Sequence, residues 1–217
     1  MDKTPPNTDF AVKIAAAADL SDLAVFLSDV FSKHEPPAVA AGFPVRKIEA
    51  LATVFGAKSI QEKLSVVARA GDTGKIIGVA LAHDFGTPPS SDIEPLIPIF
   101  EPLLAFLEGL EEKYLATKTI EAGNLLHVFM IGVDESWSGN GIAQKLLHTC
   151  IANSASHDYK TAFTEATSER SRHVFRSIGF QEQHFAAYED FVFQGSRPFA
   201  SIQGHKGCAL MDMKISS

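Results

Sequence analysis

The stretch from Leu125 to Cys150, LLHVFMIGVDESWSGNGIAQKLLHTC, constrains the fold more than any other part of this chain. An apolar run ends at Val133, a short polar turn carries Gly139 and Gly141, and apolar residues then recur at helical spacing. A strand that passes through a glycine turn into a helix suits phosphate, because the backbone can approach the anion and free N–H groups face it. The segment therefore predicts a cofactor that carries phosphate groups.

The glycine turn fits neither of two common nucleotide-binding motifs. No Gly-Lys-Ser/Thr follows, as a P-loop requires, and position 144 is Gln where a dinucleotide fingerprint has its third glycine. The hexapeptide SGNGIA instead resembles the acyl-CoA loop of the GCN5-related N-acetyltransferases (GNAT superfamily), which usually reads Arg/Gln-x-x-Gly-x-Gly/Ala. An ordinary strand–turn–helix connection is the alternative. The resemblance implies contacts to coenzyme A from Ser138, Gly139, Asn140, Gly141, Ile142 and Ala143, with serine where the family prefers Arg or Gln.

Length and composition are those of a globular domain. The chain has 217 residues, of which 46% are hydrophobic and 21% charged. No apolar run reaches the roughly 18 residues of a membrane span, and the N-terminus lacks the apolar core of a signal peptide. Two cysteines make no disulfide framework, no Cys/His cluster has zinc spacing, and a net charge of −7 argues against nucleic acid. We therefore expect a cytoplasmic protein without metal, membrane or nucleic-acid partners, with a flexible segment, 1–9, before one domain, 10–217.

Hydrophobic periodicity and turn residues predict alternating strands and helices. Strands are expected at residues 10–14, 65–70, 76–82, 125–133, 160–166, 185–193 and 208–215. Helices are expected near residues 20–31, 45–55, 100–115, 141–154 and 168–177. The four prolines of residues 84–98 predict a loop. This order predicts an α/β fold with one mixed sheet and no internal repeat.

Four further segments sharpen the resemblance. They are Phe31–Pro36, the helix Phe106–Tyr114, the segment Ser171–Phe180 that ends in Gly-Phe, and the tail Tyr188–Met211. Together they resemble the arylalkylamine (dopamine-type) N-acetyltransferases of insects, a branch of the same superfamily. The resemblance implies a GNAT fold, in which helices flank a central mixed, mostly antiparallel twisted sheet and two strands splay at the acyl-CoA site. It also implies acetyl-CoA as co-substrate and a small-molecule amine as acceptor.

The reaction that this resemblance implies needs a base, and Glu35 is the candidate. An aliphatic amine has a pKa of about 10, so at neutral pH it is mostly ammonium and cannot attack a thioester. Glu35 follows a predicted amphipathic helix and precedes Pro36-Pro37, which predicts stiff, extended backbone. A partly apolar pocket would raise its pKa toward neutrality. The resemblance places the family's proposed catalytic glutamate here; a solvated loop glutamate or a helix cap is the alternative.

The sequence offers no clear general acid. Many GNAT enzymes use a tyrosine in the helix of their second motif, where this chain has Phe175, a residue that the resemblance places against the cofactor. The arylalkylamine type has two hydroxyl residues proposed to assist catalysis, and these fall on Thr167 and Ser171. The alternative for both is structural, because Thr167 or Ser168 can cap a helix whose first turn contains Ser171.

The resemblance also assigns the pantetheine arm and leaves the acceptor pocket open. Main-chain groups of Ile131, Gly132 and Val133 occupy the place that contacts the pantetheine arm in the family. Residues 84–98 are a candidate lid over the acceptor. Candidate contacts to the amine, against surface charge or core packing as alternatives, are Asp84, Asp92, Glu94, Phe85, Phe100, Phe185 and Tyr188.

Three functions remain open. The first is an acetyl-CoA-dependent N-acetyltransferase that acts on a small amine. The second is a catalytically silent acyl-CoA-binding sensor, because Ser138 and Phe175 both depart from the common pattern. The third is a GNAT enzyme that modifies a protein amine, which would need an open groove. The oligomeric state is open between a monomer and a homodimer, and the sequence shows no coiled-coil heptad.

Overall fold

The structure of the protein is a computed structural model that describes residues 9–118 and 120–215. Residues 1–8 of the predicted flexible segment lie outside this range. One sheet contains all the named strands in the order β1-β2-β3-β4-β5-β7-β6, and every neighbouring pair is antiparallel except β4 and β5. The strands are β1 (Phe10–Ile14), β2 (Val66–Ala70), β3 (Ile76–Asp84), β4 (Leu125–Val133), β5 (Thr161–Ala166), β6 (Gln181–Ala187) and β7 (Gly207–Lys214).

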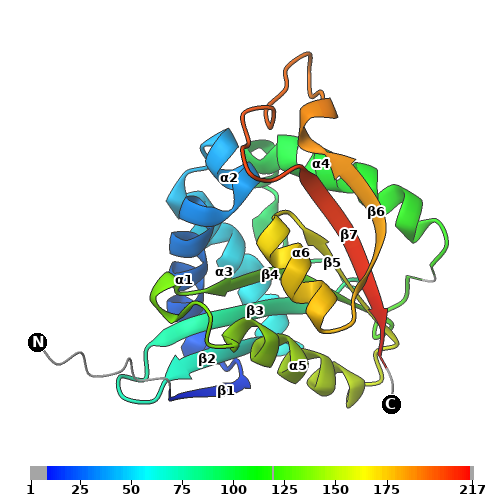
Figure 1. Ribbon diagram of the computed structural model, residues 1–217. Helices are drawn as coiled ribbons and strands as arrows, with labels where there is room; N and C mark the ends of the chain where they lie inside the picture. The colour runs from blue at the N-terminus through cyan, green and yellow to red at the C-terminus, as the bar shows by residue number, and fades with distance from the viewer. Residues whose placement is uncertain (1–8, 119, 216–217) are drawn as a thin grey trace, which may run out of the picture.

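Helices cover both faces of the sheet (Figure 1). They are α1 (Leu20–His34), α2 (Pro36–Ala41), α3 (Val45–Gln61), α4 (Ile97–Leu115), α5 (Ile142–Ala155) and α6 (Glu169–Ser177). Four short 3₁₀ turns are η1 (Ala17–Asp19), η2 (Ser91–Ile93), η3 (Glu135–Trp137) and η4 (Tyr188–Asp190). The α5 and α6 helices share one apolar core with the sheet, whereas α1, α3 and α4 pack against the opposite face. No helix within the described ranges is long and apolar enough to cross a membrane.

The parallel strands β4 and β5 part after a short pairing. Their register joins residues 125–127 of β4 to residues 161–163 of β5. After this pairing, the two strands are joined by a hydrogen bond of 2.9 Å from the Thr164 hydroxyl to the carbonyl of Val128. Beyond it, β4 stays paired with β3 and β5 with β7, so one edge of each strand faces a gap in the sheet. The fold expected from the resemblance, with splayed strands, is confirmed.

A β-bulge lies beside this gap. Leu81 of β3 pairs with Met130 and Ala82 pairs with Val128, so Phe129 is the extra residue on β4. Bulges bend a strand and re-aim its side chains. The Phe129 side chain lines the cavity described below.

The structure corrects two predicted elements. The pair Pro36-Pro37 begins the short helix α2, because proline lacks an N–H that the first helical turn leaves unused, and only Glu35 is extended, at φ −83° and ψ 117°. The strand predicted at 185–193 lies at Gln181–Ala187 and ends in a 3₁₀ turn. This strand forms the sheet edge and is largely exposed, so its polar sequence carried no strand signal.

Candidate active site

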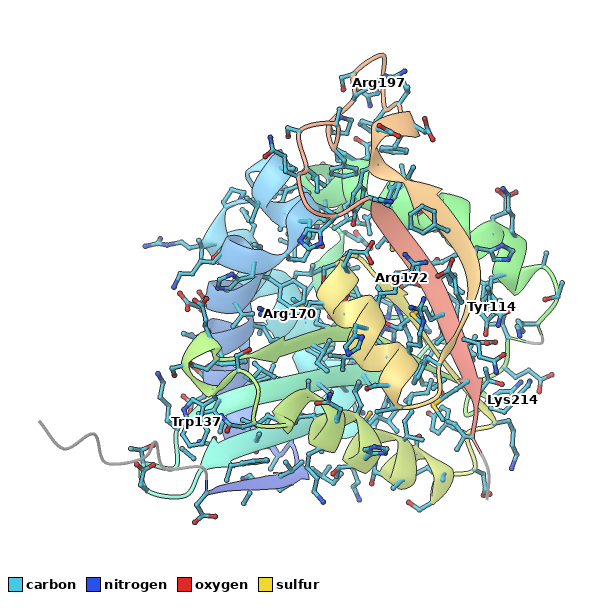
Figure 2. The ribbon with its side chains drawn as sticks, viewed as in Figure 1. Tyr114, Trp137, Arg170, Arg172, Arg197 and Lys214 are labelled. Atoms are coloured by element: carbon cyan, nitrogen blue, oxygen red, sulfur yellow. The ribbon has the colours of Figure 1, made fainter. Side chains whose placement is uncertain are left out.

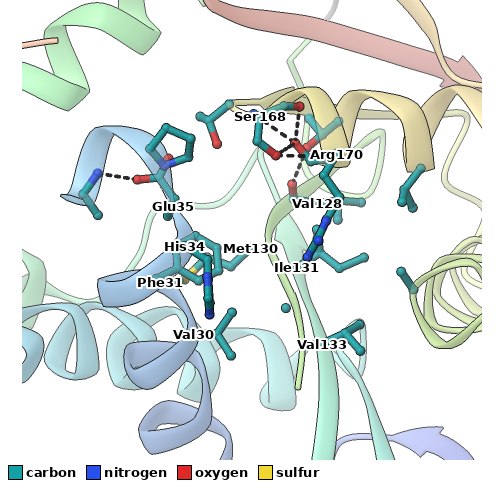
Figure 3. A pocket seen from close by; sticks show the side chains of 18 of the residues that line it. Val30, Phe31, His34, Glu35, Val128, Met130, Ile131, Val133, Ser168 and Arg170 are labelled. Atoms are coloured by element: carbon teal, nitrogen blue, oxygen red, sulfur yellow. Dashed lines mark hydrogen bonds between the residues drawn. The ribbon is translucent and has the colours of Figure 1, made fainter. Parts of the chain in front are cut away.

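A cavity of about 470 Å³ lies at the gap between β4 and β5. Its walls come from the α1–α2 junction, α3, α4, β4, the glycine loop and the N-terminal part of α6. Figure 3 shows Glu35 and His34 on one side of this cavity and Ser168 and Arg170 on the other. The fold therefore brings segments that are far apart in the chain to one place.

The predicted acyl-CoA loop forms one end of the cavity. Gly139 and Gly141 have φ of 84° and 73°, a left-handed conformation that glycine adopts without strain. Gly141 is the N-cap of α5, and no side chain caps this helix, so its first-turn N–H groups are available to an anion. Asn140 does not line the cavity; its amide donates a hydrogen bond to the Trp137 carbonyl at 3.1 Å. The other predicted loop residues line it, namely Ser138, Gly139, Gly141, Ile142 and Ala143.

The predicted pantetheine strand lies along the cavity. Ile131, Gly132 and Val133 all line it, at the part of β4 that has no partner on the β5 side. A Cβ atom at Gly132 would lie 3.2 Å from the Val30 side chain of α1. The absence of a side chain there lets α1 pack closely against β4 and bring its C-terminal end to the cavity.

Glu35 is buried at the end of α1, where it lines the cavity. Its carboxylate accepts a hydrogen bond from the backbone N–H of Ala38, which makes it the N-cap of α2. Burial raises the pKa of Glu35 to about 7, against the opposing effects of the Ala38 N–H and the Thr167 side chain. The helix-cap alternative is therefore realised, and the same carboxylate has a pKa suited to proton transfer near neutral pH.

The two predicted hydroxyl residues lie at the N-terminus of α6 and both line the cavity. Thr167 interacts with Glu35, and its carbonyl accepts a hydrogen bond of 2.6 Å from Tyr188. Ser171 forms a capping box with Ser168: each backbone N–H donates to the other's hydroxyl oxygen, at 3.0 and 3.1 Å. Ser171 thus stabilises the first turn of α6, and its catalytic role stays a prediction.

The position of the expected general acid is occupied by Phe175. Phe175 lines the cavity, is 1% exposed and packs edge-on against Phe180 at 5.0 Å. No tyrosine or cysteine is found among the described lining residues. The nearby Tyr188 phenol is buried, its pKa is raised by burial and by the charges of Cys208 and Glu35, and its proton is held by the Thr167 carbonyl. A thiol has an ordinary pKa of about 8.5, so a departing thiolate needs protonation by a general acid less than an alkoxide would.

The predicted lid does not cover the cavity. None of the described residues 84–98 lines it. Asp84 is buried and holds the loop together, because its carboxylate accepts hydrogen bonds from the backbone N–H groups of Gly86 and Gly123 at 2.8 and 2.7 Å. Of the predicted aromatic contacts only Phe100 lines the cavity; the others in its wall are Phe31, Phe43, Phe129, Trp137 and Phe175.

Three functional candidates escaped the sequence patterns. Arg170 extends from α6 into the cavity and is the one arginine or lysine among the described lining residues (Figures 2 and 3). His34 and Glu165 also line the cavity. An arginine in a polar helix and a glutamate on a β-strand have no local signature, so only the tertiary structure identifies them.

Comparisons with known proteins agree with this geometry. Residues 112–197 match a family model described as an acetyltransferase (GNAT) domain. The C-terminal condensation domain of Ebony, solved with β-alanyl-dopamine, is similar in structure, with a TM-score of 0.83, 18% identity, and coverage of 95% of this chain and 99% of that one. Arylalkylamine N-acetyltransferase 2 from Aedes aegypti has a TM-score of 0.78 and 20% identity, over 96% and 100% of the two chains. The polyamine N-acetyltransferase of Drosophila melanogaster, which forms N-acetylagmatine, has a TM-score of 0.71 and 18% identity, over 95% and 100%.

Proposed function

We propose that the chain transfers an acetyl group from acetyl-CoA to the primary amine of a small molecule, because residues 112–197 match a GNAT acetyltransferase domain and the whole fold is similar to those of N-acetyltransferases. The observation that carries this proposal is the buried Glu35 carboxylate, with a pKa of about 7, in the same cavity as the glycine loop. A base and a place for the acyl donor are the two parts that the reaction needs.

The cavity fits the donor at three places. The uncapped N-terminus of α5 and its glycine loop suit the pyrophosphate. Arg170 can supply the positive side-chain charge toward the pyrophosphate that the glycine loop lacks, because that loop has Ser138 where the family prefers Arg or Gln. The unpaired edge of β4 at residues 131–133 can hydrogen-bond the amides of the pantetheine arm.

Bound acetyl-CoA supplies an acetyl thioester, and the residues of the chain prepare the amine to attack it. Glu35 accepts a proton from the ammonium form, directly or through water, and leaves a nucleophilic amine. The Ala38 N–H and Thr167 hold the carboxylate in place for this transfer. The Ser171 hydroxyl, which lines the same cavity, donates a hydrogen bond of 2.9 Å to the Ser168 carbonyl. We propose that it assists the acetyl transfer when it gives up this bond and hydrogen-bonds the substrate.

An arylalkylamine is the acceptor that we favour. We take the acceptor part of the cavity to be the region lined by Phe31, Phe43, Phe100 and Phe129, which belong with Ala38 to one apolar cluster next to Glu35. Such an aromatic wall matches a ring better than a polyamine chain. The structural relatives named above include an arylalkylamine N-acetyltransferase, a domain solved with β-alanyl-dopamine, and a polyamine N-acetyltransferase that forms N-acetylagmatine. A catalytically silent acyl-CoA sensor is the second candidate, and the absence of a tyrosine among the described lining residues is the observation that favours it.

The decisive experiment follows thiol release from acetyl-CoA in the presence of tryptamine, tyramine or spermidine. Turnover with an aromatic amine supports the proposal, whereas acetyl-CoA binding without thiol release on any amine supports the sensor. Calorimetric titration of the Arg170→Gln variant with acetyl-CoA should show affinity about tenfold lower, because one charge-assisted contact is worth about 1.5–3 kcal/mol. Unchanged affinity would remove Arg170 from the donor site without affecting the proposal for Glu35.

A further inference from the structure

Tyr188 is a buried phenol that does not line the cavity and that the mechanism above does not use. It begins η4, in the segment that lies beyond the end of β6 beside α4 (Figure 1), and it is 2% exposed. Its ring packs against the rings of Phe106 and Phe199, with centroid distances of 5.3 and 5.9 Å. Its backbone N–H donates a hydrogen bond of 3.1 Å to the Lys206 carbonyl. These contacts fix the ring and therefore the direction of its hydroxyl.

The Tyr188 hydroxyl is bonded to the link between β5 and α6. β5 ends at Ala166 and the N-cap of α6 is Ser168, so Thr167 is the one residue between the strand and the cap. The pairing of β5 with β7 also ends at Ala166. The hydroxyl donates a hydrogen bond of 2.6 Å to the Thr167 carbonyl, and this bond fixes the orientation of a backbone that lies outside both elements.

The side chain of Thr167 connects this link to the candidate base. Thr167 lines the cavity, and its side chain hydrogen-bonds the Glu35 carboxylate. Burial raises the pKa of Glu35, whereas the hydrogen bonds from the Ala38 N–H and from Thr167 lower it. A hydrogen bond favours the ionised acid only while the donor keeps its distance and angle. Two hydrogen bonds thus join Tyr188 to Glu35 through a single residue.

The phenol keeps its proton over the pH range in which Glu35 titrates. Burial and the charges of Cys208 and Glu35 raise the pKa of Tyr188 above its ordinary value of 10, and burial also raises the pKa of the Cys208 thiol. A donor that stays protonated can orient its partner but does not supply a proton to the reaction. The other titratable or charged groups that face this region are Glu165 of β5, Glu111 of α4, His34 of α1 and Arg170 of α6.

We propose that Tyr188 is a positioning residue: from outside the cavity, its hydroxyl holds the backbone of Thr167 so that the Thr167 side chain stays on the Glu35 carboxylate. The inference rests on the proposed role of Glu35 in acetyl transfer and identifies what supports that residue. The segment after β6 then helps to set the acidity of a carboxylate at the other end of the chain.

The test measures the pKa of Glu35 by NMR titration of protein labelled with ¹³C at the glutamate side-chain carboxyl. Glu35→Gln identifies the resonance, because Glu111 also has a pKa of about 7. In Tyr188→Phe, which removes one oxygen atom and keeps the ring, the pKa of Glu35 should rise by about 0.5–1 pH unit, the effect of one lost hydrogen bond. Thr167→Val should give a similar rise, whereas Thr167→Ser keeps the hydroxyl and should leave the pKa unchanged.

The matched control is Tyr114→Phe. Tyr114 is also buried, belongs to the same apolar cluster as Tyr188 and donates a hydrogen bond of 2.7 Å, but its acceptor is Asp212 and it does not line the cavity. This variant loses the same atom from the same cluster and should leave the pKa of Glu35 unchanged. The double variant Tyr188→Phe/Thr167→Val should show no larger rise than Thr167→Val alone, because both changes remove one connected path.

Turnover gives a second measurement of the same effect. In Tyr188→Phe, kcat/KM at pH 6 should fall about three- to tenfold, because less of Glu35 is ionised there. The calorimetric affinity for acetyl-CoA should stay unchanged, since Tyr188 does not line the cavity. Absence of thiol release with every amine in the wild type would refute the proposed transfer, and the NMR titration, which needs no turnover, would still decide the role of Tyr188.

Three outcomes would overturn the inference. They are an unchanged pKa of Glu35 in Tyr188→Phe, an equal rise in Tyr114→Phe, and a further rise when Tyr188→Phe is added to Thr167→Val, which would mean that the phenol acts on Glu35 directly. If Tyr188→Phe does not fold by circular dichroism, Phe106→Leu takes its place, because it leaves the hydroxyl and removes one ring that holds it. An unchanged pKa of Glu35 in Phe106→Leu would then contradict the inference.

Discussion

At the scale of single residues, Glu35 caps a helix and also has the burial and the pKa that the proposed role of general base requires. It caps α2 through the Ala38 N–H, and it is buried in the cavity with a pKa of about 7. The cap fixes the carboxylate where proline at the first position of α2 sets the backbone direction. A group whose position is set by the fold needs no reorganisation when it accepts a proton.

The pH dependence of the rate tests this base. Glu35 must be ionised to accept a proton, so kcat/KM should rise with pH through an apparent pKa near 7. Glu35→Gln should remove this limb of the profile and lower turnover by about 10²-fold or more. The control is Glu111→Gln, because burial and the Glu165 charge also raise the pKa of Glu111 to about 7, yet it does not line the cavity. If the rise of kcat/KM with pH persists in Glu35→Gln and disappears in Glu111→Gln, the titrating group is Glu111 and Glu35 is not the base.

At the scale of elements, the loop before α5 can be tested by its glycines. Gly141 and Gly74 both have positive φ, 73° and 67°, and an added Cβ would meet no atom within 4 Å at either. Alanine at either position should lower the free energy of unfolding by about 1–2 kcal/mol through backbone strain. Only Gly141→Ala should also weaken acetyl-CoA binding, by about tenfold, because Gly141 lines the cavity and Gly74 lies in the β2–β3 turn. Urea unfolding and calorimetry separate the two effects; equal affinities in both variants would argue against the loop as a phosphate site.

The elements also show what a sequence can predict. The strand at 125–133 and the helix after Gly141 have their predicted bounds within one residue, because local periodicity and turn glycines determine both. The gap between β4 and β5 and the bulge at Phe129 arise from pairing between distant segments, which no local pattern encodes. Which segments line the cavity also depends on tertiary structure. The prediction that residues 84–98 form a lid was therefore wrong, and Glu165 was not predicted to line the cavity although it lies on a predicted strand.

At the scale of the whole molecule, the buried acids make stability depend on pH. Glu35 has an ordinary pKa of 4.5 when unfolded and about 7 when folded, so the folded state binds its proton more tightly. This contribution is fully present below about pH 4.5 and is lost as the pH rises to 7, a change of about 3 kcal/mol. The raised pKa values of Glu111 and His127 act in the same direction, whereas the lowered pKa of buried His83 opposes them.

We therefore expect the protein to be more stable to urea at pH 5 than at pH 8. Glu35→Gln should reduce this difference by about 2 kcal/mol or more, since the amide does not titrate. Glu112→Gln, which alters an exposed carboxylate on α4, serves as the control and should leave the difference unchanged. A wild-type difference that Glu35→Gln does not reduce would mean that other groups set the pH dependence.

The parting of β4 and β5 has a consequence for aggregation as well as for binding. An unpaired strand edge on the outside of a protein invites another chain to add to the sheet. Here the two open edges turn toward each other inside the molecule, with α6 on one side and the end of α1 on the other. Because these edges line an internal cavity, a ligand chain that carries amides could hydrogen-bond them there. The fold thus keeps unpaired backbone groups for binding a ligand and places them where another protein chain cannot easily add a strand.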